Sequence, residues 1–267
     1  MNSPPANKPV TISGNLAAPK KIQIAGKVDI ATPSYGSQYA GVYVRSLYKL
    51  LTHPRLREVQ FAFSYIDYAD IVVARNYLIS NFYFNKPDCS HILFWDDDMG
   101  FEPDLVEAML ALGKDVVGAV YPKRAIALDR LHSSHDQPFP AAHARACDFI
   151  GDFAPVTVRD QPFMRMNQIG TGVMLISRNC LDVMVSKLPE IVDNKRFKKL
   201  GFTNVFKTFI TPFNKVELED RELSEDFSFC HRWVKQCQGE IYASVVHPVE
   251  HVGQLTVKAL YADRGIV

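Results

Sequence analysis

"HILFWDDDMGF", residues 91–101, leads from an apolar run into three consecutive aspartates and then returns at once to Met, Gly and Phe. The apolar beginning is typical of a buried strand, so Asp96, Asp97 and Asp98 lie at the carboxyl end of that strand. Carboxylates this close together repel one another and raise one another's pKa unless a positive charge lies between them. A divalent cation is the simplest partner for such a group.

The segments on both sides of this stretch alternate between strand and helix patterns. Alternation of this kind predicts an α/β domain with a mostly parallel central sheet and helices on both faces. In open sheets of this type, ligands bind beyond the carboxyl ends of the strands. The predicted strands lie at 27–32, 57–66, 91–95 and 115–120, and the predicted helices at 37–53, 69–84 (capped by Asp70) and 102–113 (ended by Gly113).

The remainder of the chain divides into an arm, an insertion and a second set of elements. Residues 1–20 are predicted to be a flexible arm, and residues 21–267 a single domain. From about 125 to 166 the periodicity disappears, which predicts a loop-rich insertion that orders over a bound ligand. Further on, the pattern predicts a strand and helix at 172–188, a strand at 203–213, a helix at 223–239 and a strand at 240–246.

Composition excludes several classes of protein. A chain of 267 residues with 47% hydrophobic residues can bury one full core. A net charge of +1 argues against a protein that binds nucleic acid through electrostatics. No apolar run approaches the roughly 20 residues of a transmembrane span, and no signal peptide is recognisable. The five cysteines form no CxxC motif and are interpreted as reduced thiols of a cytoplasmic protein.

The aspartates are candidate metal ligands. Asp96 and Asp98 would project to one side of an extended backbone while Asp97 projects to the other. Oxygen ligands suit Mg²⁺ or Mn²⁺, and a metal held by few protein groups usually shares its coordination sphere with a substrate diphosphate. His251 either completes the coordination, with His247 as a rival, or is a solvated loop histidine. The alternative is an acidic turn in which Asp98 caps the next helix.

Two further motifs are candidates for chemistry. In "IGTGVMLIS", residues 169–177, two glycines flank Thr171 and allow either close approach of a ligand or a plain turn. In "SED", residues 224–226, Ser224 is a potential helix cap. Glu225 and Asp226 either stabilise the helix dipole or include a general base.

Taken in order, the Asp-x-Asp motif, the glycine loop, the "SED" segment and the final "HVG" with His251 resemble those of GT-A-fold glycosyltransferases of the family 2 type. The resemblance covers about residues 27 to 253. It implies a GT-A sheet, a nucleotide-sugar donor such as a UDP- or GDP-sugar, a Mn²⁺ or Mg²⁺ cofactor, and transfer to a glycan, small-molecule or protein acceptor, with inversion as the expected outcome.

The resemblance also implies roles for single residues. Asp98 would bridge the metal to the donor phosphates, Asp96 would face the ribose or share the ion, and Asp226 would be the general base, with Glu225 holding the acceptor. The donor-binding candidates are Thr32, Pro33 and Tyr35 at the first strand end, Asp96 and Asp97, and the loop residues Gly170, Thr171 and Gly172.

Cations near the predicted site have two interpretations each. Arg75, beside Asn76 in an apolar helix, must find an anion or a carbonyl partner, and either contacts the donor or pairs with an aspartate. Lys123 and Arg124 follow a predicted strand and would neutralise the departing diphosphate, or form a solvated loop pair. The insertion histidines, His132, His135 and His143, lack a tight metal-ligand spacing and are interpreted as loop or acceptor contacts.

Competing functions differ in what the sequence should carry. A sugar-phosphate nucleotidyltransferase would need a Gly-rich phosphate loop with an arginine after the first strand, which "ATPSYGSQYAG" matches poorly. A metal-dependent hydrolase would need more ligands than these motifs supply. A non-catalytic nucleotide-sugar or glycan-binding module would lack a base, against which "SED" argues.

Overall fold

A central sheet of seven strands organises the protein in the computed structural model, which describes residues 26–151, 162–193, 205–206 and 208–253. Five of the strands run in one direction, and β9 and β8 run against them. The predicted mostly parallel α/β sheet is therefore confirmed. In spatial order the strands are β2 (Phe61–Asp67), β1 (Lys27–Ser34), β3 (Cys89–Trp95), β9 (Val173–Ser177), β5 (Val116–Ala119), β10 (Ile241–Ser244) and β8 (Phe163–Met166).

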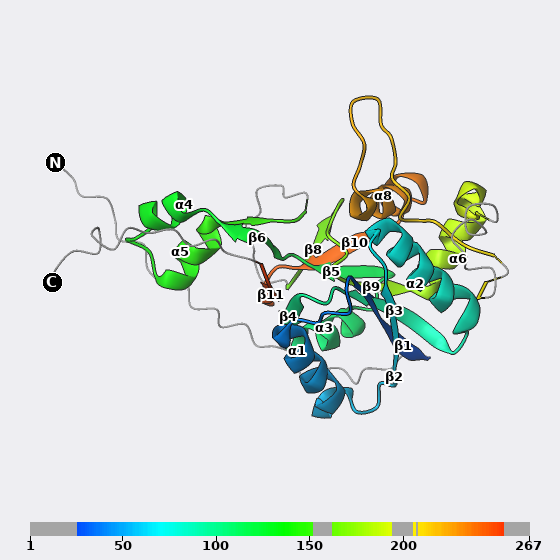
Figure 1. Ribbon diagram of the computed structural model, residues 1–267, viewed down its shortest axis with the longest axis horizontal. Helices are drawn as coiled ribbons and strands as arrows, with labels where there is room; N and C mark the ends of the chain where they lie inside the picture. Colours follow the sequence, from blue (N-terminus) through cyan, green and yellow to red (C-terminus); the bar gives the residue numbers. More distant parts are fainter. Residues whose placement is uncertain (1–25, 152–161, 194–204, 207, 254–267) are drawn as a thin grey trace.

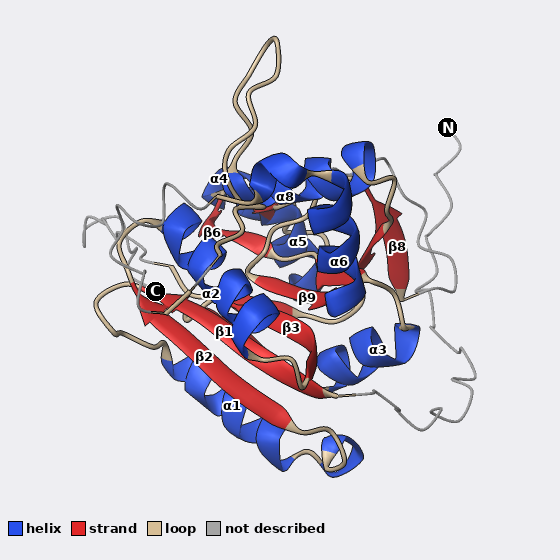
Figure 2. Ribbon diagram, turned by 90° about the vertical axis from the view of Figure 1, so that its right-hand side faces the viewer, coloured by secondary structure: helices blue, strands red, loops and turns tan. Residues whose placement is uncertain are grey.

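Helices cover both faces of this sheet (Figures 1 and 2). The alternation of β3 shows why: Ile92 and Phe94 belong to one buried cluster, and Leu93 and Trp95 to the other. A strand with large apolar side chains on both faces requires cover on both. The first cluster includes residues of α2 (Ile71–Asn85), α6 (Arg178–Lys187) and α8 (Glu225–His231), and the second includes residues of α1 (Gly41–Thr52) and α3 (Asp104–Leu112).

Local signals place the helix ends as predicted. The Asp70 carboxylate accepts hydrogen bonds from the backbone N–H groups of Val72 and Val73 and so caps α2. Gly113 ends α3 with φ of 63°, a left-handed conformation that favours glycine. Ser224 caps α8 by accepting from the N–H of Phe227.

The return to Met-Gly-Phe after the aspartates forms a short strand that the sequence pattern did not reveal. This strand, β4 (Met99–Phe101), pairs in antiparallel fashion with β11 (Val249–His251). In their register His251 lies opposite Met99, and the backbone N–H of Val252 donates to the Asp98 carbonyl at 2.9 Å. The β4–β11 ribbon thus brings the end of the described chain beside the aspartates.

Three predicted elements differ from the structure. The segment expected to be loop-rich contains β6 (Pro122–Ile126), α4 (Leu128–Ser133), α5 (Phe139–Ala146) and β7 (Cys147–Phe149), an excursion that extends from the sheet in Figure 1. These helices escape periodicity analysis because they are short and mostly exposed. Residues 205–206 and 208–213 form no strand beyond a bridge of Ile210 with Val192. The helix expected to reach 239 continues beyond α8 as a π-helix, η4 (Arg232–Gln236).

Two further single turns, η1 (Pro54–Leu56) and η2 (Pro189–Ile191), complete the described elements. The predicted arm at 1–20 lies outside the described residues. Among the helices of the described ranges, none combines the length and the apolar character needed to cross a bilayer.

Candidate functional site

A buried arginine joins the aspartate motif to the "SED" motif. Arg75, whose side chain is 4% exposed, lies 3.1 Å from Asp96 Oδ2 and 3.4 Å from Glu225 Oε1, and it also pairs with Asp226 Oδ1. Burial raises the pKa of Asp96, even though Arg75 opposes that effect. Of the two interpretations of Arg75, the structure supports pairing with carboxylates.

The three carboxylates converge on Arg75 because of where their elements begin and end. Asp96 directly follows β3, while Glu225 and Asp226 occupy the first turn of α8. Three further polar contacts of α2 hold the chain before α8. Asn76 Nδ2 donates to Asn214 Oδ1, Asn76 Oδ1 accepts from the Phe213 N–H, and the Ser80 hydroxyl bonds to Ile210. The Asn76 side chain is thus satisfied within the protein and positions the α8 approach.

A second arginine connects Asp98 to the histidine of the "HVG" motif. Arg124 Nη2 lies 2.5 Å from Asp98 Oδ2, and Arg124 Nε donates to His251 Nε2 at 2.8 Å. His251 Nε2 is itself 3.6 Å from Asp98 Oδ2. The structure therefore brings together Asp98, Arg124 and His251 from three segments that are far apart in the sequence.

The hydrogen bond at the other ring nitrogen fixes the tautomer of His251. His251 Nδ1 lies 2.7 Å from the carbonyl oxygen of Pro122, which can only accept, so Nδ1 carries the proton. The lone pair of neutral His251 is then on Nε2, facing Asp98. His247, the rival, instead has its Nδ1 at 2.7 Å from the Ser244 hydroxyl, and burial lowers its pKa.

Three observations indicate that Asp98 and His251 could hold a divalent metal ion. Asp98 Oδ1 is buried and has no hydrogen-bond partner among the described residues. Nε2 of His251 carries its lone pair toward the same carboxylate. The Arg124 guanidinium already lies between the two groups as a cation. A carboxylate oxygen together with an imidazole nitrogen suits a divalent first-row ion, Mn²⁺ among them.

Asp96 does not share this arrangement in the way predicted. Residues 96–98 form a turn, with the Met99 N–H donating to the Asp96 carbonyl at 3.1 Å, so the alternation of an extended strand does not apply. Consequently the Asp96 carboxylate contacts Arg75 and the Asp98 carboxylate contacts Arg124. Burial also raises the pKa of Asp97, whose carbonyl accepts from the Ala40 N–H at the start of α1.

The glycine loop is shaped by a tyrosine that the sequence did not single out. Tyr121 is buried, and its hydroxyl accepts from the Gly172 N–H at 2.9 Å. A Cβ atom at Gly170 or Gly172 would overlap the Tyr121 side chain. Thr171 is fully buried in this loop. The packing of Tyr121 is therefore a sufficient reason for both glycines, and a contact of this loop with a donor remains a prediction.

The predicted donor-binding residues at the end of β1 differ in their exposure to solvent. The Thr32 hydroxyl is 2.7 Å from the Tyr43 hydroxyl in the core, so its side chain has a structural role, and Pro33 is buried as well. Tyr35 is 75% exposed. The loop that carries Tyr35 is held by Asp67, which accepts hydrogen bonds from Gly36 and Ser37. Of these three predicted residues, Tyr35 alone presents its side chain to solvent.

A different group that could hold a metal lies at the other end of α1. Ligand atoms of His53, Asp104 and Glu107 lie within 4.8 Å of one another. Asp104 and Glu107 are one helical turn apart on α3, but His53 is 51 residues distant from Asp104 (104 minus 53), so no sequence motif reveals the group. Arg55 pairs with both carboxylates, at 2.7 and 2.9 Å.

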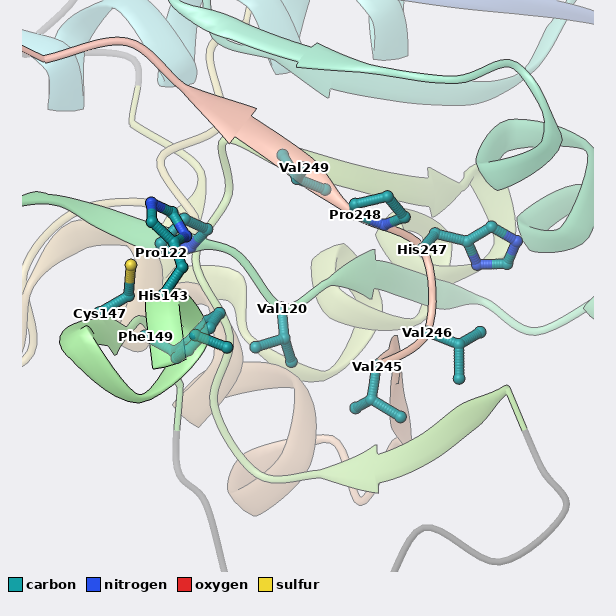
Figure 3. Close-up of a pocket in the computed structure, with 11 residues that line it drawn as sticks. Val120, Pro122, His143, Cys147, Phe149, Val245, Val246, His247, Pro248 and Val249 are labelled. Carbon is teal, nitrogen blue, oxygen red and sulfur yellow. The ribbon is translucent and has the colours of Figure 1, made fainter. Parts of the chain in front are cut away.

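An apolar pocket of about 710 Å³ borders the site (Figure 3). Its lining comes from β6, α5 and β7 on one side and from the chain between β10 and β11 on the other. Pro122 belongs to this lining and also supplies the carbonyl that bonds His251. His143 lines the pocket as well, whereas Lys123, on β6, is exposed.

Comparisons with known proteins give only distant likenesses. No protein-family model matches the sequence, and no curated protein matches it. Similar solved structures include A197 from STIV, at 15% identity and a TM-score of 0.43, covering 88% of this chain and 98% of that one. GalNAc-T7 with UDP, GalNAc and Mn²⁺ has 8% identity and a TM-score of 0.45, covering 86% of this chain and 44% of that one.

A third similar structure is a glycosyltransferase involved in the glycosylation of the major capsid of PBCV-1. It has 12% identity and a TM-score of 0.30, and the match covers 67% of this chain and 76% of that one.

Proposed function

We propose that this protein is a metal-dependent glycosyltransferase that transfers a sugar from a nucleoside-diphosphate sugar to an acceptor hydroxyl with inversion. The observation that carries the proposal is the convergence of two separate groups at the carboxyl end of β3. Asp98 and His251 offer an oxygen and a nitrogen ligand to one cation, and Asp226 presents a carboxylate on the neighbouring α8.

In the proposed mechanism Asp226 removes the proton of the acceptor hydroxyl. The contact with Arg75 uses Oδ1, so we assign the acceptor proton to Oδ2. As the proton leaves, the acceptor oxygen bonds to the anomeric carbon and the bond from that carbon to the diphosphate oxygen breaks. A Mn²⁺ or Mg²⁺ ion held by Asp98 and His251 would stabilise the negative charge of the diphosphate.

Arg75 acts in this proposal as a positioning residue. Its guanidinium is buried among carboxylates of the protein, so it holds Asp226 and fixes the start of α8 relative to Asp96. Tyr35, Asp97, Lys123 and Arg124 remain the proposed donor contacts that are not enclosed in the core.

A non-catalytic nucleotide-sugar-binding module is the second candidate, because the Arg75 cluster could serve the fold alone. The two functions make the same metal and nucleotide contacts and differ in turnover. A sugar-phosphate nucleotidyltransferase is less well supported, because Gly36 and Ser37 in the loop after β1 are bonded to Asp67.

Binding of a nucleoside diphosphate in the presence of Mn²⁺ tests the proposal. Calorimetry of the parent with UDP and GDP, followed by a screen of the corresponding nucleotide sugars, should reveal one Mn²⁺-dependent ligand. Asp98→Ala should abolish this binding, and Asp104→Ala, which removes a carboxylate from the other metal-capable group, should preserve it. Loss of binding in Asp104→Ala with full binding in Asp98→Ala would refute the assignment.

A further inference from the structure

The Arg124 guanidinium occupies the ligand atoms that a metal would need. It contacts Asp98 Oδ2 at 2.5 Å, and its Nε–H group is directed at the lone pair of His251 Nε2 at 2.8 Å. Because His251 Nδ1 is committed to the Pro122 carbonyl, Nε2 is the nitrogen available to either cation. Arg124 and a divalent ion would therefore compete for the same two atoms.

The three residues differ in their freedom to move. The side chain of Arg124 is 58% exposed, whereas those of Asp98 and His251 are 18% and 8% exposed. The backbone N–H of Val252 also anchors the Asp98 segment to the end of β11. An incoming ion would thus meet a fixed pair of ligands and a movable guanidinium.

We propose that Arg124 exchanges partners: in the absence of metal it pairs with the Asp98 carboxylate and donates to His251 Nε2, and it moves to the diphosphate of the donor once a metal holds these residues. This inference rests on the proposed function. Arg124 lies on β6, beside the site. A guanidinium forms paired hydrogen bonds with phosphate oxygens, so Arg124 suits a diphosphate partner. The exchange keeps positive charge near Asp98 in both states and delivers a second cation only when the donor is present.

The exchange predicts opposite effects of one substitution on two ligands. Arg124→Gln removes the competing cation, so Mn²⁺ alone should bind more tightly by up to about fivefold, as expected for loss of an ion pair of this exposure. At saturating Mn²⁺ the same variant should bind UDP or GDP, whichever the parent prefers, about three- to tenfold more weakly. Lys123→Gln is the matched control for the Mn²⁺ titration, since it removes the same charge from the adjacent exposed position, and Lys123 has no ion pair with Asp98 or His251 among the described contacts. Because Lys123 is itself a proposed donor contact, the nucleotide affinity of Arg124→Gln is compared with that of the parent.

Free Mn²⁺ measured by electron paramagnetic resonance gives the first affinity, and calorimetry with nucleotide gives the second. Arg124→Gln binding Mn²⁺ no more tightly than Lys123→Gln would overturn the exchange, as would parental nucleotide affinity at saturating Mn²⁺. Either result would leave the proposed function standing, provided that the parent protein binds nucleotide and that Asp98→Ala abolishes this binding. A parent that binds no Mn²⁺ with or without nucleotide would overturn both.

Discussion

Arg75 and Arg124 each connect an aspartate of the 96–98 turn to a residue from the carboxyl-terminal third of the chain, yet their surroundings are opposite. Arg75 is almost fully buried and is surrounded by three carboxylates, while more than half of the Arg124 side chain is exposed and contacts one carboxylate and one imidazole. Removing one member of a buried ion pair leaves its partners charged and buried without a counter-ion. Water can solvate the partners of an exposed ion pair. Arg75 therefore belongs to the fixed architecture, and Arg124 has the freedom that the proposed ligand exchange requires.

The largest effect is expected from Asp226→Asn. Asp96 and Glu225 still neutralise Arg75 in this variant, so the fold and the donor affinity should persist. The amide cannot accept the acceptor proton, and general-base contributions are about a hundred- to ten-thousand-fold, so single-turnover transfer at saturating donor should fall by that factor. Near-parental transfer would remove Asp226 from the mechanism and direct attention to Glu225.

Arg75→Met should destabilise the protein by about 3–5 kcal/mol at pH 7, because three carboxylates then lack a buried counter-ion. Urea unfolding at several pH values measures this. Without Arg75 the pKa of Asp96, already raised by burial, rises further, so the folded state binds more protons than the unfolded state at intermediate pH. The free energy of unfolding of the variant should therefore increase as pH falls from 7 toward about 4.

Arg178→Met provides the control for this pH dependence. Arg178 donates to the carbonyl oxygens of Tyr83 and Lys86, at 2.9 and 2.6 Å, at the end of α2. Carbonyl groups do not titrate, so the loss of stability in this variant should not shrink on acidification. Equal pH profiles for the two variants would show that Arg75 does not serve as a counter-ion.

The sequence predicted the sheet class and the order of the motifs because both depend on local patterns. A buried strand is recognised from the apolar run before Asp96 alone. The caps Asp70 and Ser224 bond to residues two or three positions later, so they too are visible in a short stretch of sequence. The partners of the motifs are not local: Arg75 meets Asp226 across 151 positions (226 minus 75). The packing of α2 against the start of α8 decides that Arg75 pairs with carboxylates. This packing cannot be predicted from the spacing of residues in the sequence.

Errors of sequence interpretation have similar causes. β4 has three residues and gains its stability from β11, about 150 positions later, so its pattern is too short to be recognised. The bond of the Thr32 hydroxyl to Tyr43 within the core is not visible in the sequence either, and a contact of Thr32 with a donor stays a prediction. Tyr121 was overlooked because an isolated tyrosine after an apolar run gives no sign of the two glycines that lie against it.

Gly170→Ala tests whether the loop beside Tyr121 is held as rigidly as the surroundings of Arg75. The new methyl group would overlap the Tyr121 hydroxyl and also approach Ile150, so a loss of about 1–3 kcal/mol in unfolding free energy is expected. Adding Tyr121→Phe removes the overlapped oxygen, and a double-mutant cycle should show that the double variant is less destabilised than the sum of the two single variants. Strict additivity would mean that the loop moves away from Tyr121 without cost.

The smallest effect should come from Arg124→Gln on stability, and it completes the contrast with Arg75. Water can solvate the Asp98 carboxylate edge that Arg124 releases, and neutral His251 keeps its hydrogen bond to Pro122, so no charge is stranded in the core. Ion pairs of this exposure contribute about 0.2–1 kcal/mol, so urea unfolding at pH 7 without metal should place the variant within about 1 kcal/mol of the parent. A loss comparable to that of Arg75→Met would show that Arg124 is equally a structural counter-ion, and a guanidinium that the fold requires could not leave Asp98 for a diphosphate.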